Sequence, residues 1–245
     1  MFLESMAKFP RSSSPQALSV ASVTEPGNVK LTVERMLEFD DAKIGFTHAK
    51  TWAAMPAARR GVIKSSSSQL VYPGTHPRVE SCIRALCELG ERSPVETKRF
   101  ADFPQSGLTI NRQLEWGPGV TINVKGVCWY VDGQNPIIPL LQPRKLGLAD
   151  EKLCLYAELG QNAYCNGDWA NGRVEIVDLS GEDDVWAEVI EHKDIGQLSE
   201  NRVREFVDTY LEAKQVADKI RSARPKPATK PRGDDLFDLP PSKGA

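Results

Sequence analysis

The feature that most constrains the fold is a change of hydrophobic period near the middle of the chain. From Leu108 to Leu141, apolar and polar residues alternate in runs of strand length, with turn signals at 116–119 (WGPG) and at Asp132-Gly133. Apolar residues at helical spacing stand before this region, at 75–90, and after it, at 148–164. Strands bracketed by amphipathic helices predict an α/β (α+β) domain with a central mixed β-sheet flanked by helices.

The remaining elements extend this order. Residues 173–179 (RVEIVDL) alternate like a strand, 185–190 form a second candidate strand, and Ser199 opens a long helix with one apolar face. A β-meander is the simplest arrangement of the strands between 108 and 141. The pattern at 29–39 fits a helix and a strand equally badly, so membership of residues 30–64 in the core stays open.

Both ends of the chain differ in composition from the middle. Residues 1–28 are rich in serine, proline and alanine, and from 221 the sequence becomes basic and broken by prolines. Such segments bury too little apolar area to offset the entropy of ordering them. We therefore predict disordered tails at 1–28 and 223–245 around a single domain at 29–222.

Charge and cysteine content exclude several function classes. The formal net charge of -2 gives no global attraction to nucleic acid, so contact with DNA would need a local basic patch. The apolar runs are far shorter than the roughly 20 residues that span a bilayer, and the first residues lack the apolar stretch of a secretory signal. Five cysteines without a CxxC pair do not indicate a zinc site. We expect a soluble, cytoplasmic protein without membrane contact.

One segment carries a possible chemistry. The sequence VKGVCWYVDGQNPIIPLLQPRK at 124–145, followed by LADEKLCLYAEL at 148–159, resembles the core of the PD-(D/E)XK phosphodiesterase superfamily of nucleases. In that superfamily a strand bearing Gly-x-x-Asp leads by a hairpin to a second strand ending in Glu-x-Lys or Gln-x-Lys, and a helix follows. Gly126 matches the glycine, Gln142 and Lys145 match the second motif, and Tyr156 matches the aromatic residue of the helix. The resemblance covers roughly a quarter of the chain through short motifs.

The resemblance implies a restriction-endonuclease-like core that handles DNA. Asp132, Gln142 and Lys145 would be catalytic, with Asp132 holding Mg²⁺ or Mn²⁺ and the lysine stabilising charge as water attacks a phosphodiester. Arg144 and Tyr156 would contact the bound DNA.

The segment also departs from the motif. Trp129 stands where the first aspartate is expected, and Gln142 is separated from Lys145 by one residue too many. An amide is also a weaker ligand than a carboxylate for a hard metal ion. Two versions of the hypothesis therefore remain: a weak metal-dependent nuclease, or a DNA-binding relative that does not cleave. In a purely structural interpretation, Asp132-Gly133 is a hairpin turn and 142–145 a polar strand exit.

Two further hypotheses use other parts of the chain. The motif DDLFDL at 234–239 places Leu236 and Phe237 on a basic linker, where a partner's groove could capture them. The protein would then be a non-enzymatic interaction protein. A third hypothesis is a small-molecule enzyme whose polar residues come together only in the folded chain.

Overall fold

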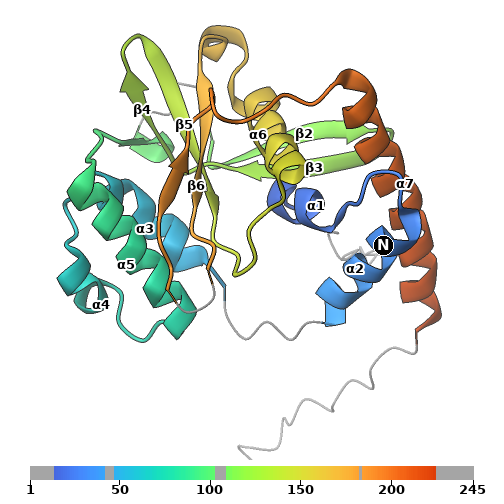
Figure 1. The fold of residues 1–245 in the computed structure, drawn as a ribbon, viewed down its shortest axis with the longest axis horizontal. Helices are drawn as coiled ribbons and strands as arrows, with labels where there is room; N and C mark the ends of the chain where they lie inside the picture. Colours follow the sequence, from blue (N-terminus) through green and yellow to red (C-terminus); the bar gives the residue numbers. More distant parts are fainter. Residues whose placement is uncertain (1–13, 42–46, 103–108, 182–183, 225–245) are drawn as a thin grey trace, which may run out of the picture.

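A five-stranded mixed sheet separates two groups of helices in the computed structural model, which describes residues 14–41, 47–102, 109–181 and 184–224 (Figure 1). The strand order is β1-β4-β5-β6-β7. The strands are β1 (Lys98–Arg99), β4 (Cys128–Asp132), β5 (Asn135–Gln142), β6 (Arg173–Asp178) and β7 (Glu188–Ile190). This confirms the predicted α/β class with a mixed sheet.

The centre of the sheet is a parallel strand pair. β5 and β6 run parallel, in register from Ile137 opposite Arg173 to Gln142 opposite Asp178, and α6 (Asp150–Tyr164) makes the crossover between them. The neighbouring pairs are antiparallel. β4 and β5 form a hairpin whose turn contains Gly133 at a φ of +61°, a conformation that favours glycine, so the predicted turn is confirmed.

One face of the sheet is covered by α3 (Ala49–Arg59) and α5 (Pro77–Arg92) (Figure 1). The 3-10 turn η1 (Ser65–Ser67) and α4 (Ser68–Val71) pack against α5. The sequence predicts that this helix ends at Gly90, but α5 continues to Arg92. A Cβ on Gly90 would lie 1.8 Å from the carbonyl oxygen of Ala58, so this glycine permits the close approach of α3 and α5. Trp52 and Met55 are buried here, which places residues 49–59 in the core.

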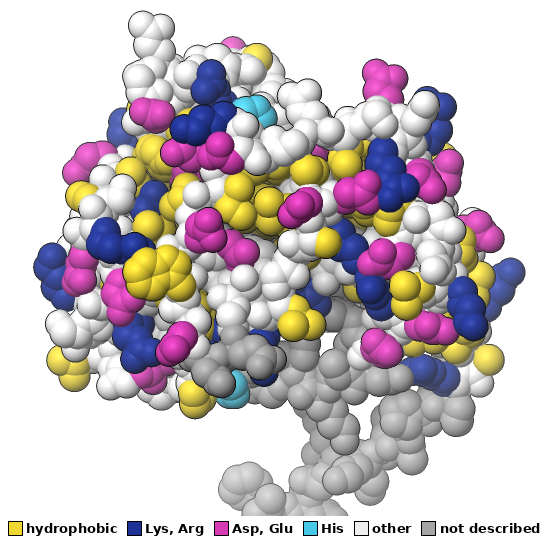
Figure 2. All heavy atoms as spheres, viewed as in Figure 1, with side chains coloured by type: hydrophobic (Ala, Val, Ile, Leu, Met, Phe, Trp, Pro, Cys, Tyr) yellow, Lys and Arg dark blue, Asp and Glu magenta, His cyan; other side chains and the backbone are white. Residues whose placement is uncertain are grey.

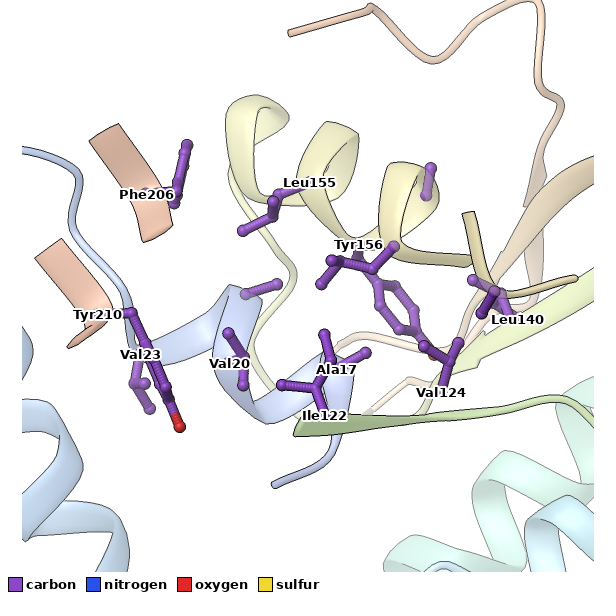
Figure 3. Packing of buried hydrophobic residues seen from close by; sticks show 14 of the residues in the cluster. Ala17, Val20, Val23, Ile122, Val124, Leu140, Leu155, Tyr156, Phe206 and Tyr210 are labelled. Atoms are coloured by element: carbon purple, nitrogen blue, oxygen red, sulfur yellow. The ribbon is translucent and has the colours of Figure 1, made fainter. Parts of the chain in front are cut away.

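The other face carries α6, the hairpin of β2 (Asn111–Gly117) and β3 (Val120–Lys125), and the helices α1 (Ala17–Val23), α2 (Val29–Asp41) and α7 (Glu200–Ala223). Their apolar side chains meet in one cluster, which Figure 3 shows from close by. Val20 of α1, Ile122 of β3, Leu155 of α6 and Phe206 of α7 all point into it. The short 3-10 turns η2 (Phe100–Asp102) and η4 (Gly167–Trp169) complete the described elements.

Two predictions about the N-terminal part and the strands are corrected. Residues 14–28 are not a disordered tail, because α1 buries Ala17, Val20, Ala21 and Val23 in the core. The strands do not form one meander either, since β2 and β3 make a separate two-stranded sheet. The hydroxyl of Tyr164 accepts a hydrogen bond of 2.8 Å from the Gly126 nitrogen, and this contact fixes the chain between β3 and β4. Residues 1–13 and 225–245 lie outside the described part of the chain.

No helix within the described ranges is long and apolar enough to cross a membrane.

Candidate functional site

The structure separates the residues that the motif would bring together. Asp132 pairs with Asn135 at the hairpin end of the β4–β5 pair, whereas Gln142 is the last residue of β5, at the other end of that strand. Seven residues at about 3.3 Å each put these two positions on the order of 23 Å apart. They do not form one site.

Gln142 has a structural role. Its buried side chain donates from Nε2 to Oδ1 of Asp178 (3.2 Å) and to the carbonyl of Leu146 (3.3 Å). Its Oε1 accepts a hydrogen bond of 2.6 Å from the Arg144 nitrogen. The amide thus uses its donor and acceptor atoms to shape the loop that follows β5.

Arg78 of α5 ties the two loops that leave the parallel strands. Its terminal nitrogens donate to the carbonyls of Pro143 and Arg144 after β5, and to those of Leu179 and Gly181 after β6. The shortest of these bonds is 2.6 Å. Both loops are therefore held at the carboxyl ends of parallel strands, where α/β proteins commonly bind ligands.

A groove opens beside the loop after β5. Residues 144–152 form one wall of a cavity of about 810 Å³, and side chains of α1, α2 and the turn between them form the other. Cations and anions alternate around it. Its charged residues are Arg35, Arg144, Lys145 and Lys152 with Glu25, Glu38, Asp150 and Glu151. We call this cavity the basic-loop groove.

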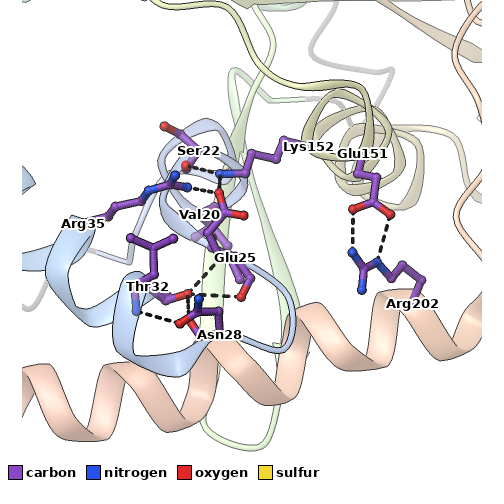
Figure 4. A network of polar contacts seen from close by, with 11 residues as sticks. Val20, Ser22, Glu25, Asn28, Thr32, Arg35, Glu151, Lys152 and Arg202 are labelled. Carbon is purple, nitrogen blue, oxygen red and sulfur yellow. Dashed lines mark hydrogen bonds and ion pairs between the residues drawn. The ribbon is translucent and has the colours of Figure 1, made fainter.

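An ion-pair network forms the floor of the basic-loop groove (Figure 4). Glu25 pairs with both Arg35 and Lys152, and the Lys152 ammonium also donates to the carbonyl of Ser22 at 2.9 Å. Burial, together with the positive charges of Arg35 and Arg144, lowers the pKa of Lys152 to about 8 despite its ion pair with Glu25. This lysine therefore changes charge within the range of ordinary working pH.

The other predicted binding residues are placed differently. Lys145 is exposed and Arg144 is half-buried; both lie on the groove wall, and burial lowers the pKa of Arg144.

Tyr156 is in the core, where its hydroxyl donates to the Leu141 carbonyl at 3.1 Å. Gly126 packs against Tyr164 and the ring of Phe100, so its role is also structural. Leu236 and Phe237 lie outside the described residues.

A second polar site, which the sequence did not indicate, lies under α3. Glu175 of β6 and Arg59 of α3 are buried, with side chains only 4% and 3% exposed. Oε2 of Glu175 accepts a hydrogen bond of 2.6 Å from the hydroxyl of Tyr130. Burial raises the pKa of Glu175, and raises that of Tyr130 as well. A cavity of about 200 Å³ adjoins these three residues, with Asp132 in its lining.

A weak signal for this site exists in the strand 173–179. In a strand, Glu175 points to the face opposite that of Val174 and Ile176. In an amphipathic strand the face of Glu175 would be the one exposed to solvent. In the structure β6 lies between β5 and β7, with α3 over that face, so the carboxylate is buried instead.

The described residues do not fit the predicted Mg²⁺ or Mn²⁺ site. Nowhere in the described ranges do three or more His, Cys, Asp or Glu side chains gather so as to hold a metal ion. Trp129, at the position of the missing aspartate, packs edge-on against Trp169 with ring centres 5.0 Å apart. The position where the motif has its metal-holding aspartate therefore carries a tryptophan that packs against a second tryptophan.

Comparisons with known proteins leave the family open. No family model matches the chain, and searches of curated proteins and of solved structures give no significant match.

Proposed function

We propose that this chain is a nucleic-acid-binding protein with a nuclease-like core, and that it binds the phosphate backbone of DNA in the basic-loop groove without cleaving it. The order of elements supports the proposal: the hairpin β4–β5 is followed by α6 and then by β6, parallel to β5. This is the order of strand, hairpin, strand and helix that the resemblance implies.

The observation that carries the proposal is the placement of Arg144 and Lys145. Both lie on a loop held by Arg78 and Gln142, at the carboxyl ends of parallel strands, and face Arg35 across the groove. A rigid loop loses little entropy when its cations contact phosphates, and such contacts position a nucleic acid without reading its sequence.

The absence of cleavage follows from the separation of Asp132 and Gln142 at opposite ends of β5. A metal-dependent phosphodiester cleavage needs a metal-holding carboxylate and the motif lysine around one phosphate. Lys145 lies three residues beyond Gln142, past the end of β5 that is opposite the hairpin turn.

Charge distribution sets the expected strength of binding. Figure 2 shows Lys and Arg side chains interspersed with Asp and Glu over the visible face, without a broad patch of one sign. Each phosphate contact changes the slope of log K against log salt by about -0.9. With four groove cations, the slope should not be steeper than about -4.

Fluorescence anisotropy with labelled single- and double-stranded DNA tests the proposal. The double variant Arg144→Ala/Lys145→Ala should bind at least tenfold more weakly, with a salt slope reduced by about 2. Arg84→Ala, an exposed cation of α5 on the opposite face of the sheet, is the matched control and should bind like the wild type. Equal binding by the double variant and the wild type would overturn the proposal.

A second control addresses the basic segment near the C-terminus. The variant Lys226→Ala/Lys230→Ala/Arg232→Ala should retain most of the DNA affinity if the groove carries it. A denaturing gel in Mg²⁺ and in Mn²⁺ should show intact DNA. Metal-dependent cleavage that Lys145→Ala abolishes would instead establish an active nuclease.

A further inference from the structure

One side chain of the basic-loop groove is not suited to binding phosphates. Leu146 follows Arg144 and Lys145 on the groove wall, and it is 75% exposed. The loop that presents this leucine is fixed. Nε2 of Gln142 donates to the Leu146 carbonyl at 3.3 Å, and Arg78 donates to the carbonyl of Arg144 at 3.1 Å. A rigid loop therefore holds an apolar side chain in solvent beside two cations.

Other apolar residues line the groove together with Leu146. Pro26 and Leu148 are partly exposed in this lining, and Ala149 is exposed. A single exposed leucine needs no explanation, but apolar residues gathered in one cavity form a surface that a ligand can cover. A phosphate backbone would use the cations of the groove and leave this apolar surface in solvent. An acidic peptide with apolar side chains would cover both.

Two carboxylates of the groove are already held by cations. Glu25 pairs with Arg35 and with Lys152. Glu151 accepts hydrogen bonds of 3.0 and 2.6 Å from Arg202. A carboxylate in contact with a cation repels another anion less than an isolated carboxylate does. An acidic ligand therefore meets less repulsion in this groove than the number of its carboxylates suggests.

The chain itself contains a segment of this composition. Residues 234–239 (DDLFDL), which lie outside the described part of the chain, combine three aspartates with three apolar side chains. Two aspartates precede Leu236 in this segment, and two cations precede Leu146 in the groove. The segment and the groove wall are therefore opposite in charge, and each has an apolar side chain beside its charges.

The segment is also close enough to reach the groove. Phe206 of α7 lines the groove, and the helix continues from there to its C-cap at Arg224, about 27 Å further at about 1.5 Å per residue. Ten residue steps separate Arg224 from Asp234, and three prolines in 225–233 favour an extended spacer. At about 3.1 Å per residue, such a spacer spans about 31 Å. Its length matches the distance back along α7.

We propose that residues 234–239 of the same chain dock in the basic-loop groove and exclude DNA from it. The aspartates contact the cations of the 144–146 loop, and Leu236 and Phe237 cover Leu146. A short linker holds a tethered segment at an effective concentration of about 1 mM, so a segment with a Kd of about 100 μM would weaken DNA binding about tenfold. The competition with DNA rests on the proposed function, whereas the docking does not.

Titration of the full chain against a fluorescein-labelled peptide, GDDLFDLPP, tests the docking. The tail variant, Leu236→Ala/Phe237→Ala, should bind this peptide at least fivefold more tightly than the wild type, whose own segment occupies the groove. The peptide GDDAADLPP has the same charge without the two apolar side chains. It is the matched control and should bind the tail variant at least tenfold more weakly. Failure of GDDLFDLPP to bind the tail variant, or equal binding by the wild type, would overturn the proposal.

Changes in the groove locate the docked peptide. In the background of the tail variant, Arg144→Ala/Lys145→Ala should abolish peptide binding, and Leu146→Ala should weaken it about fivefold, with thermal melting to confirm that each protein is folded. Arg84→Ala, the exposed cation of α5, should leave peptide binding unchanged. Unaltered peptide affinity in folded Arg144→Ala/Lys145→Ala would place the docking site elsewhere and overturn the assignment.

Light scattering distinguishes docking within one chain from docking on a second copy. The wild type and the tail variant should both have the mass of a single chain. A larger mass that only the wild type shows would assign the segment to the groove of a second copy and overturn docking within one chain.

Anisotropy titrations with labelled DNA test the competition. The tail variant should bind DNA about tenfold more tightly than the wild type. Leu146→Ala alone should also bind DNA more tightly, because it weakens the docked segment and leaves the groove cations in place. Equal DNA affinity of the wild type and the tail variant would overturn the competition. If no variant binds DNA, the proposed function fails, and the peptide titrations still decide the docking.

Discussion

Two regions along the parallel pair of β5 and β6 differ in how their buried polar groups are paired. At the carboxyl end, the amide of Gln142 makes three hydrogen bonds, and Arg78 supplies donors to four carbonyls. Near the middle of the pair, Glu175 lies opposite Pro139, and Glu175 and Arg59 each have one buried atom without a hydrogen-bond partner in the described structure. The residues that resemble the motif therefore have their hydrogen bonds satisfied, whereas the incompletely satisfied groups lie in a region without a motif.

The largest effect should come from removing the arginine that holds the carboxyl end together. Arg78→Ala leaves four carbonyls without their donor, and we expect the free energy of unfolding to fall by about 3–5 kcal/mol. Urea denaturation measures this. Arg84→Ala on the same helix should change stability by less than about 0.5 kcal/mol. Similar small changes in both variants would contradict the structural role of this end.

A restored motif carboxylate should destabilise the protein instead of activating it. In Gln142→Glu a second carboxylate would replace the amide nitrogen that lies 3.2 Å from Oδ1 of Asp178. We expect a loss of about 2 kcal/mol at neutral pH, partly recovered on acidification as one carboxyl takes up a proton. Thermal melts at several pH values and a DNA gel in Mg²⁺ check this. Unchanged stability together with new cleavage would show that the carboxyl end is a dormant active site.

The buried carboxyl of Glu175 should make the stability of the protein depend on pH. Burial raises the pKa of Glu175 above its unfolded value of about 4.3. The stabilising contribution is therefore complete below that unfolded value and is lost as pH rises through the higher folded pKa, by about 1.4 kcal/mol per unit of elevation. The stability of the wild type relative to Glu175→Gln should fall between pH 4 and pH 8 in urea titrations. A flat difference would mean that Glu175 is well solvated.

The smallest effect should be at the basic-loop groove. Because the pKa of Lys152 is about 8, raising the pH from 7 to 9 removes most of its positive charge. DNA affinity should fall by a factor of about three, the scale of one weak ion pair. Lys152→Gln should show no such change in anisotropy titrations. A pH response that persists in this variant would assign the titrating group to another residue.

Much of the fold followed from hydrophobic period alone. The helices predicted at 75–90 and 148–164 correspond to Pro77–Arg92 and Asp150–Tyr164 in the structure. Each has a continuous apolar stripe that packs on the sheet, so local pattern and tertiary environment agree.

Helix α1 was missed because its stability does not come from local pattern. Ala17–Val23 has only seven residues in a region rich in serine and alanine, too short to be stable alone. Its burial depends on β3 and α6, which begin at Val120 and Asp150, more than a hundred residues later in the sequence.

The candidate sites were only partly predictable for a related reason. Arg144 and Lys145 were singled out through the motif resemblance, and the structure places both on the wall of the basic-loop groove, where their binding role stays a prediction. The contact of Arg59 with Glu175 depends on which face of β6 α3 covers, and no local pattern specifies that. The pairing of Gln142 with Asp178 likewise depends on the parallel register of β5 and β6.

The packing of α2 against α7 has a consequence for synthesis of the protein. Residues 29–41 contact the helix at 200–223, and the Gly27 nitrogen donates to the hydroxyl of Thr209 at 2.9 Å. At about 5–20 residues per second, the ribosome needs roughly ten to thirty seconds to make the intervening chain. During that interval the apolar residues Val33 and Met36 lack the helix that covers them. The nascent chain therefore exposes a hydrophobic surface until residues 200–223 have been made, and chaperone binding during that interval should concentrate on α2.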